Sequence, residues 1–226
     1  PDRIVIGADN DVILDKAEKF FSVIPAPVIR MGLRSAEMTK HALNAFLATS
    51  ISFGSEIANI CDEVGADATK VAQALRSESR IGNGIPLLPG LGFAGGTLAR
   101  DLKILKRIGS ENNYETLLID SVFIVNQRQN TTVIRKLERI FGLLKGLNIG
   151  VLGITYKPGT STLRRSSSLE IITELVKRGA TVKAFDPKAD MDEVKEHVEF
   201  EFCDDAYTVA QNSDALIIIT EWPEFK

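Results

Sequence analysis

Apolar residues recur at three- and four-residue steps along residues 35–64, and this spacing predicts one long amphipathic helix. Ser35 is placed to cap the start of this helix, and Gly65 is placed to end it. A helix of about thirty residues exceeds the usual length in globular proteins, so we expect it to span between lobes or between subunits. The residues that set the period are Met38, Leu43, Phe46, Leu47, Ile51, Ile57 and Ile60.

The helical period returns in three later segments and is interrupted once. The segments are 67–79, which Asp67 is placed to cap, 97–113 and 115–142. A glycine- and proline-rich loop over residues 80–96 separates the first two. Loops of this length are usually functional or disordered, and the apolar content of this one argues against disorder. Residues 34–146 therefore predict an all-helical domain apart from the loop.

After residue 146 the helical period gives way to a continuous apolar run, LNIGVLGITY at 147–156, which predicts a buried strand. A helical pattern and two further strand patterns follow, over 167–180, 181–187 and 214–220. The strand–helix–strand order predicts a parallel doubly wound sheet. The predicted fold class is α/β overall, an all-helical central domain with long helices followed by a Rossmann-like parallel α/β domain.

The first 33 residues predict a strand in RIVIG at 3–7, a helix over 10–24 and an extended connection enforced by two prolines over 25–32. Strand patterns at both ends of the chain, RIVIG and DALIIIT, lack flanking elements. We therefore expect a piece of a larger protein whose last α/β domain is truncated.

Composition narrows the classes of function. The chain has 226 residues, a formal net charge of −3 and 44% hydrophobic residues. No run reaches the ~20 apolar residues of a membrane span, and no dense Lys/Arg cluster indicates nucleic-acid binding. Cys61 and Cys203 lack a CxxC partner and a nearby histidine. We expect two reduced thiols, a cytoplasmic protein and no metal site.

The candidate chemistry of the second half lies in the turn after its first strand. GVLG at 150–153 is a weak dinucleotide fingerprint, because a third glycine is missing. Lys157 and Arg164 follow the strand, and Ser167–Glu170 has the S-x-x-E form of a capping box. Two cations beside a helix N-terminus suit a diphosphate, although a solvated basic loop over a capped helix fits the same residues. Asp186 could accept from a ribose hydroxyl, but we favour a turn aspartate before a proline.

On the long helix, Lys40 and Asn44 are four residues apart and share one face. Together they could stabilise an oxyanion and hold a water molecule. From these two residues alone we favour a structural interpretation without chemistry, in which the lysine is exposed to solvent and lies above an asparagine that faces the helix. Glu37 and His41 belong to the neighbouring strip of the helix, and we assign them no role.

The glycines of the loop free its backbone to approach a ligand or to adopt positive φ. Arg100 and Asp101 then fall on the first turn of the next helix. A tight helix–helix connection is the alternative, but it does not explain a loop that is long as well as rich in glycine. The glycines in question are Gly90, Gly92, Gly95 and Gly96.

Taken in order, these motifs resemble the UDP-glucose/GDP-mannose dehydrogenase family over nearly the whole chain. AEMTKHALNAFLATSISFGSEIANICDEVGAD is similar to the central helix of the family, and RIG…PGLGFAGG…RD to its active-site loop. GVLGITYKPGTSTLRRSSSLEII resembles the start of its nucleotide-binding C-terminal domain, and FDPKA and DALIIITEWPEF complete the match. Several linked motifs in the right order make the resemblance specific.

The resemblance implies an NAD-dependent oxidation of the C6 alcohol of a UDP-sugar to a carboxylate, in two hydride steps. It implies that Lys40 and Asn44 stabilise the developing alkoxide or hold water, and that Asp101 assists as an acid or base. Arg80 would reach the sugar across a dimer interface, and the long helix would form the core of a homodimer. The other residues it implies are Leu88, Gly92, Phe93, Tyr156 and Lys157 at the substrate, with Arg100 and Arg164 at the cofactor.

One departure from the family concerns the catalytic cysteine. Where the family reads Gly-Gly-Ser-Cys and then Phe-Pro-Lys-Asp, residues 94–101 read AGGTLARD, which places Thr97 at the nucleophile. A thiol of pKa about 8.5 adds readily to an aldehyde, whereas a threonine hydroxyl needs a strong adjacent base. The second oxidation would then use an aldehyde hydrate or would not occur. Cys61 lies on the long helix in a structural position and cannot substitute.

The resemblance divides the chain into 1–33, a remnant of the NAD-binding domain, 34–146, the helical dimerisation domain, and 147–226, an incomplete UDP-binding domain. NAD would be bound mainly outside this chain, so we expect the chain by itself to be inactive. A non-catalytic nucleotide-sugar-binding or regulatory homologue is one alternative, and a helical dimerisation module is another. Hydroxyacid dehydrogenases would not explain the second strand–helix–strand unit.

Overall fold

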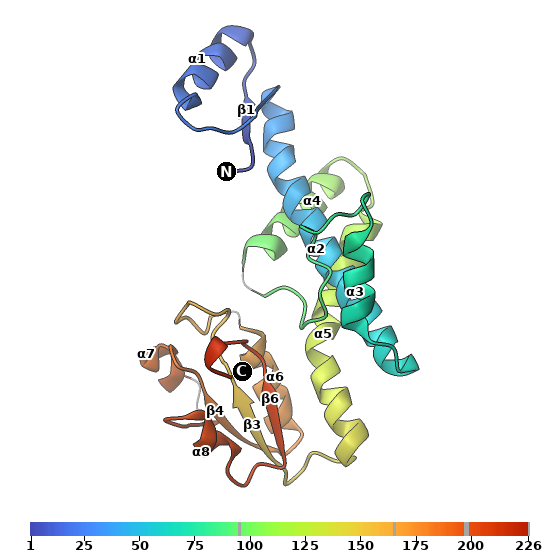
Figure 1. The fold of residues 1–226 in the computed structure, drawn as a ribbon, viewed down its shortest axis with the longest axis vertical. Helices are drawn as coiled ribbons and strands as arrows, with labels where there is room; N and C mark the ends of the chain where they lie inside the picture. Colours follow the sequence, from blue (N-terminus) through green and yellow to red (C-terminus); the bar gives the residue numbers. More distant parts are fainter. Residues whose placement is uncertain (95, 165, 197–198, 226) are drawn as a thin grey trace.

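The computed structural model describes residues 1–94, 96–164, 166–196 and 199–225. A small unit of two strands and a helix lies at one end of the molecule, and the long helix α2 (Leu33–Val64) leads away from it (Figure 1). Three further helices lie beside α2, and a four-stranded sheet lies at the opposite end of the molecule (Figure 1).

The N-terminal unit contains one strand more than its sequence predicted. Strands β1 (Ile4–Gly7) and β2 (Val28–Met31) pair in parallel, and helix α1 (Asp11–Phe21) connects them. Asn10 caps α1 by accepting from the backbone N–H of Ile13 at 3.0 Å. The prolines predicted only an extended connection before α2, but its apolar end pairs with β1 and forms β2.

Helix α2 spans 32 residues and begins before the predicted cap. Gly32 has extended backbone and Leu33 is already helical, so Ser35 lies inside the first turn and does not cap the helix. Gly65 ends α2 with φ +70°, as predicted. Because the buried face carries mostly small side chains, other segments approach α2 closely. The buried residues are Ala48, Ser50, Ser52, Gly54, Ser55, Ala58 and Cys61.

The remaining helical segments are confirmed. Helices α3 (Ala68–Ser77), α4 (Thr97–Glu111) and α5 (Leu117–Phe141) lie within or close to the predicted ranges, and Asp67 caps α3. A small core of Ala48, Phe93, Leu102 and Val122 joins α2, the loop, α4 and α5. In the ranges that the structure describes, no helix is long and apolar enough to cross a membrane.

The C-terminal part is a parallel sheet with strand order β5-β4-β3-β6, which confirms the predicted fold class. Strand β5 is a two-residue edge strand that the sequence pattern did not predict. The strands of this sheet are β3 (Asn148–Leu152), β4 (Thr181–Phe185), β5 (Glu201–Phe202) and β6 (Ala215–Ile218). The helices are α6 (Ser167–Lys177), α7 (Met191–Lys195) and α8 (Ala206–Ala210), with a 3-10 turn at Pro223–Phe225.

Helix α6 joins the sheet to the helical part because it packs on both β4 and α5. The predicted capping box at its start is wrong. Ser166, one residue earlier, caps the helix by accepting from the N–H of Ser168 at 3.1 Å. Glu170 instead accepts from the side chain of Asn130 on α5 at 2.6 Å. This packing places the start of α6 opposite the start of α4, where the main cleft lies.

Candidate functional site

A cleft of about 900 Å³ lies between α4, α5 and the start of the C-terminal sheet domain. Its sheet side is the segment that follows β3, where open parallel sheets bind their ligands. Its helical side is the end of the loop that precedes α4 and the facing side of α5. The lining residues that the chemistry depends on are Thr97, Arg100, Lys103, Asn126, Tyr156 and Arg164.

The electrostatics of the cleft favour an anion. The first-turn residues Thr97 of α4 and Ser167 of α6 both line it. Gly96 is the N-cap of α4 and offers no side chain to the first N–H groups of that helix, so these groups can donate to a ligand. Among the residues that the structure describes, the cationic side chains at the cleft are Arg100, Lys103 and Arg164, and the carboxylate is Glu170.

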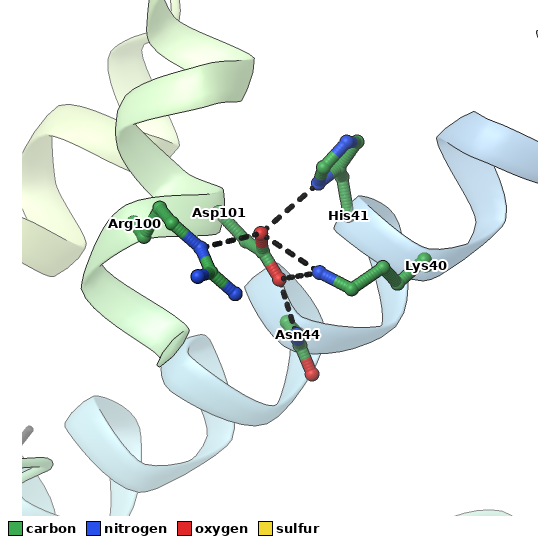
Figure 2. A network of polar contacts seen from close by, with 5 residues as sticks. All are labelled: Lys40, His41, Asn44, Arg100 and Asp101. Carbon is green, nitrogen blue, oxygen red and sulfur yellow. Dashed lines mark hydrogen bonds and ion pairs between the residues drawn. The ribbon is translucent and has the colours of Figure 1, made fainter. Parts of the chain in front are cut away.

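Beside the cleft, one carboxylate gathers four side chains (Figure 2). The Lys40 ammonium lies 2.8 Å from Oδ2 and 3.1 Å from Oδ1 of Asp101. Asn44 donates to the same Oδ2 through its Nδ2, and His41 Nδ1 lies 3.1 Å from Oδ1. Arg100, which also lines the cleft, has its Nε 3.9 Å from Oδ1. The cluster thus joins α2 to α4 at the edge of the cleft.

Asp101 is completely buried, and burial by itself raises the pKa of its carboxyl. Hydrogen bonds from Lys40, Asn44 and His41, together with the charge of Lys40, outweigh burial and lower the pKa to about 2. The carboxylate is therefore ionised at every physiological pH. Because the Lys40 side chain is 56% exposed, Asp101 anchors an ammonium that still reaches solvent.

The loop before α4 is held by polar side chains of α5. Asn126 accepts from the N–H of Phe93 at 2.8 Å and donates to its carbonyl at 3.1 Å. Gln129 donates to the carbonyl of Gly90 at 2.6 Å. Gly92 has φ +81°, and a Cβ there would lie 2.3 Å from Asn126 Oδ1, so this position requires glycine.

The comparisons with known proteins match this architecture. The central domain of the UDP-glucose/GDP-mannose dehydrogenase family matches residues 34–128, and the UDP binding domain of the same family matches residues 150–226. The chain belongs to this family. The two matches contain the whole Asp101 cluster and the lining residues of the cleft other than Asn130.

Curated relatives cover the chain completely. It is 40% identical to UDP-glucose 6-dehydrogenase TuaD of Bacillus subtilis, and spans 49% of that protein. It is 36% identical to a UDP-glucose 6-dehydrogenase of Rickettsia bellii, and spans 53% of it. The chain therefore spans about half the length of the curated relatives it matches.

A solved structure supports the same assignment. The UDP-glucose dehydrogenase of Pyrobaculum islandicum superposes with a TM-score of 0.92 at 32% identity, over 100% of this chain and 52% of the other. A UDP-D-ManNAc dehydrogenase of Pyrococcus horikoshii shares the fold, with a TM-score of 0.83 at 24% identity, over 99% of this chain and 51% of the other.

The structure brings most of the residues suggested by the family resemblance to one region. Lys40, Asn44 and Asp101 form the cluster, and Thr97, Phe93 and Arg100 lie along the α4 side of the cleft. Tyr156 and Arg164 lie on the opposite side. Of the loop glycines, Gly92 adopts positive φ and Gly96 is the N-cap of α4. Gly95 lies outside the described residues.

Four residues that the family resemblance suggested neither line the cleft nor belong to the Asp101 cluster: Arg80, Leu88, Gly92 and Lys157. Arg80 is exposed and pairs with Glu78 at 3.0 Å, and the Leu88 side chain is also exposed. Lys157 lies with its Nζ 5.4 Å from the centre of the Tyr156 ring. Of the two cations predicted to receive a diphosphate, Arg164 therefore lines the cleft and Lys157 does not.

The turn interpretation of Asp186 is confirmed, and the ribose interpretation is wrong. Its Oδ1 accepts from the N–H of Lys188 at 2.9 Å, as in an Asx turn. Its Oδ2 accepts from the N–H groups of Ile154 and Thr155, at 2.8 and 2.9 Å, and from the indole of Trp222 at 3.0 Å. The carboxylate is buried and ties the segment after β3 to the end of β4.

The sequence did not predict four residues that shape this candidate site: His41, Lys103, Asn126 and Gln129. His41 belongs to the strip of the helix next to the face that Lys40 and Asn44 share, and its position alone predicted no role. Asn126 and Gln129 lie in a helical segment, VNQRQN, whose polar residues give no sign of what they face. The one usable signal in the sequence was the run of amide side chains itself, because it interrupts the apolar side of the helix and indicates a polar contact there.

Proposed function

We propose that the protein is an NAD-dependent dehydrogenase that oxidises the C6 alcohol of a UDP-sugar. The observation that carries the proposal is the continuity of two sites, because Arg100 belongs both to the cationic cleft and to the Asp101 cluster. A nucleotide sugar has the matching form, with a diphosphate next to a sugar alcohol. The UDP binding domain match over residues 150–226 and the names of the relatives support the same substrate class.

In this proposal the cleft receives the diphosphate of the UDP-sugar. Arg164 on one wall and Lys103 on the other supply positive charge, and the uncapped start of α4 supplies backbone N–H groups. The Tyr156 ring lies in the same wall as Arg164, where it can cover one face of the nucleotide. The loop backbone at Phe93 lines the nucleotide, held in place by Asn126.

The sugar C6 oxygen would lie beside Lys40 and Asn44. Asp101 keeps the Lys40 ammonium charged and oriented, so that Lys40 donates to the oxygen as negative charge develops on it. Figure 2 shows the amide oxygen of Asn44 pointing away from Asp101, which leaves this oxygen to accept from a hydroxyl or a water. Stabilisation by groups already in position is the main rate effect that such a site supplies.

NAD, when bound, would supply the hydride acceptor for this oxidation. Arg100, which lines the cleft beside the Asp101 cluster, would contact it, with the remaining contacts made by a separate NAD-binding domain. Arg164, which the family resemblance places at the cofactor, is assigned in this proposal to the diphosphate of the UDP-sugar. We assign residues 1–33 to that domain, 34–146 to the helical dimerisation domain and 147–226 to the UDP-binding domain. The parallel pair β1–β2 with its crossover helix α1 supports the first assignment.

In this proposal Thr97 decides whether the oxidation stops at the aldehyde or continues to the uronic acid. The carboxylate nearest in sequence, Asp101, already accepts hydrogen bonds from Lys40, His41 and Asn44, so it is not free to activate the Thr97 hydroxyl. Cys61 is buried on α2 and does not line the cleft. We therefore propose a first oxidation to the aldehyde and an impaired second oxidation to the uronic acid. The second candidate function is a homologue that binds the nucleotide sugar, or regulates another protein, without turnover. Thr97 favours this candidate as well, because it lacks the thiol of a catalytic nucleophile.

We further propose a homodimer built on α2 and a cytoplasmic role in making precursors of polysaccharides. Large apolar side chains on α2 face solvent, with Phe46 58%, Phe53 48% and Ile60 54% exposed, and a second copy would cover them. Both cysteines, Cys61 and Cys203, are buried free thiols, which suits a reducing compartment.

The test uses the protein in its full natural length, incubated with UDP-glucose and NAD. NADH formation and the products are followed together by absorbance and mass spectrometry. The proposal expects NAD reduction with aldehyde or its hydrate as the main product. Tight UDP-glucose binding with no NADH would favour the binding homologue, and two NADH for each UDP-glucose would refute the impaired second step.

A further inference from the structure

The Asp101 carboxylate has a third hydrogen-bonding partner that the proposed chemistry does not use. His41 lies on α2 next to Lys40, and its Nδ1 is 3.1 Å from Oδ1 of Asp101. The His41 side chain is 21% exposed, whereas Asp101 is completely buried. A titratable ring that reaches solvent is therefore in contact with a buried charge at the candidate centre (Figure 2).

His41 and Lys40 share one acceptor atom. Lys40 Nζ lies 3.1 Å from Oδ1 and 2.8 Å from Oδ2, so it spans both oxygens of the carboxylate. Asn44 donates to Oδ2, which leaves Oδ1 as the atom that His41 and Lys40 both approach. Arg100 Nε, at 3.9 Å, is the third cationic group near Oδ1.

We infer that His41 is a positioning residue for Lys40: its Nδ1–H holds Oδ1 of Asp101, and its protonation changes how firmly Lys40 is held. An imidazolium makes a shorter and stronger hydrogen bond to a carboxylate than a neutral imidazole does. When His41 is protonated it takes Oδ1 and adds a positive charge beside Lys40, which then keeps only Oδ2. When His41 is neutral, Lys40 bridges both oxygens.

The charged groups around His41 come from both helices. Asp101 on α4 stays ionised, because its pKa is about 2. Lys40 on α2 and Arg100 on α4 supply the cations, and Glu37, four residues before His41 on α2, has an exposed side chain. Histidine is the side chain type whose charge changes between pH 5 and 8, so the imidazole is the member of this cluster through which pH acts.

Two measurements test the role of His41. The effect on kcat rests on the proposed oxidation, whereas the protonation of the imidazole ring, measured by NMR, rests on geometry alone. The kinetic test measures kcat and KM of the full-length protein from pH 5 to 9. In the wild type we expect kcat to fall by up to about tenfold from pH 8 to pH 5, because Lys40 is then held through Oδ2 alone. KM changes little, because Lys40 acts on the reacting oxygen rather than on the diphosphate.

Two substitutions separate positioning from simple packing. His41→Asn places an amide donor where Nδ1 stands but does not titrate, so the fall of kcat at acid pH disappears while kcat at pH 8 stays within about threefold of the wild type. His41→Leu removes the donor and lowers kcat about tenfold at every pH. His197→Asn, which removes the other histidine of the chain, is the matched control and keeps the wild-type profile. The same acid limb in wild type and His41→Asn overturns the inference.

A second measurement does not depend on catalysis. The ¹⁵N spectrum of histidine-labelled full-length protein reports which ring nitrogen carries the proton, and the signals lost in His41→Asn assign His41. The geometry requires the Nδ1–H tautomer in the neutral state, with Nε2 unprotonated. A neutral His41 protonated at Nε2 overturns the inference even if the enzyme is active. The Nδ1–H tautomer in a protein that never reduces NAD supports the geometry and rejects the proposed oxidation alone.

Discussion

The ammonium of Lys40 lies 2.8 Å from Oδ2 of Asp101, and the two residues are 61 positions apart in the sequence. The pair is asymmetric, because the carboxylate is fully buried while the lysine side chain is more than half exposed. A buried charge is tolerated only with compensating partners, and here they come from α2. The contact therefore fixes α4 against α2 and aims a cation at the edge of the cleft.

Asp101→Asn should uncouple this cation from its anchor. We expect the free energy of unfolding to fall by about 1–3 kcal/mol, because the hydrogen bonds from charged donors are weakened. We expect kcat to fall by about 10²–10³-fold, since Lys40 is no longer held for the developing oxyanion. Urea unfolding and steady-state kinetics measure the two effects. Asp120→Asn, which breaks the surface pair with Lys106, is the control and should cost less than about 1 kcal/mol.

The lowered pKa of Asp101 makes part of the stability depend on pH. The pKa in the folded state is about 2, below the ordinary value of 3.8. The stabilisation is therefore fully present above about pH 4 and is lost as the pH falls through 2. Urea unfolding in steps from pH 5 to pH 2 should show a smaller loss in Asp101→Asn than in the wild type. Equal losses in both proteins would contradict the assignment.

The loop before α4 offers a test of packing. Gly92→Ala places a Cβ against Asn126 Oδ1 at a residue with φ +81°, so we expect about 1–3 kcal/mol of destabilisation from backbone strain and collision. Asn126→Ala removes both hydrogen bonds to Phe93 and should cost a similar amount. The double variant should lose less than the sum, because the collision is gone. Thermal unfolding of the four proteins measures this coupling, and Gly90→Ala, where a Cβ meets no atom within 4 Å, is the control.

The sequence predicted the elements well because their hydrophobic periods are long and uninterrupted. The four central helices and three of the four C-terminal strands follow directly from these periods. Strand β2 was missed because two prolines dominate its surroundings, and β5 because it is only two residues long within a short alternating run, EFEFC at 199–203. The N-caps of α2 and α6 were mispredicted because serine is common near helix starts, and its position alone does not show which serine, if any, accepts the capping bond.

The candidate site was predictable only in part, since contacts between helices depend on how the helices pack. The spacing of Lys40 and Asn44 indicated a shared face, but no local pattern indicated that Asp101 would lie against it. His41 extends the cluster although it lies one residue beyond that face. A helix residue whose side chain leans toward the preceding turn can reach a partner that simple spacing assigns to its neighbour.

Arg164 provides a direct test of the cleft as a diphosphate site. Arg164→Ala should weaken UDP binding by about 10–100-fold, because a charged hydrogen-bond donor to the phosphates is lost. Isothermal calorimetry with UDP measures the change. Arg107→Ala is the matched control, because Arg107 lies on α4 but outside the cleft and pairs with Glu111. If both variants bind UDP equally well, the diphosphate does not lie in this cleft.

Thr97→Cys tests whether this residue limits the second oxidation. Thr97 begins α4, where the helix N-terminus favours an anionic thiolate and lowers the pKa of a cysteine. The thiolate would add to the aldehyde and form a hemithioacetal whose carbon is oxidised in the next step, whereas the threonine hydroxyl lacks a free base. We expect the variant to raise the yield of uronic acid for each UDP-glucose consumed, while the rate of the first oxidation changes by less than about threefold. Thr97→Ser is the control, since it keeps a hydroxyl and should give the wild-type product ratio. A wild-type protein that already forms uronic acid as fast as the cysteine variant would show that Thr97 does not limit the reaction.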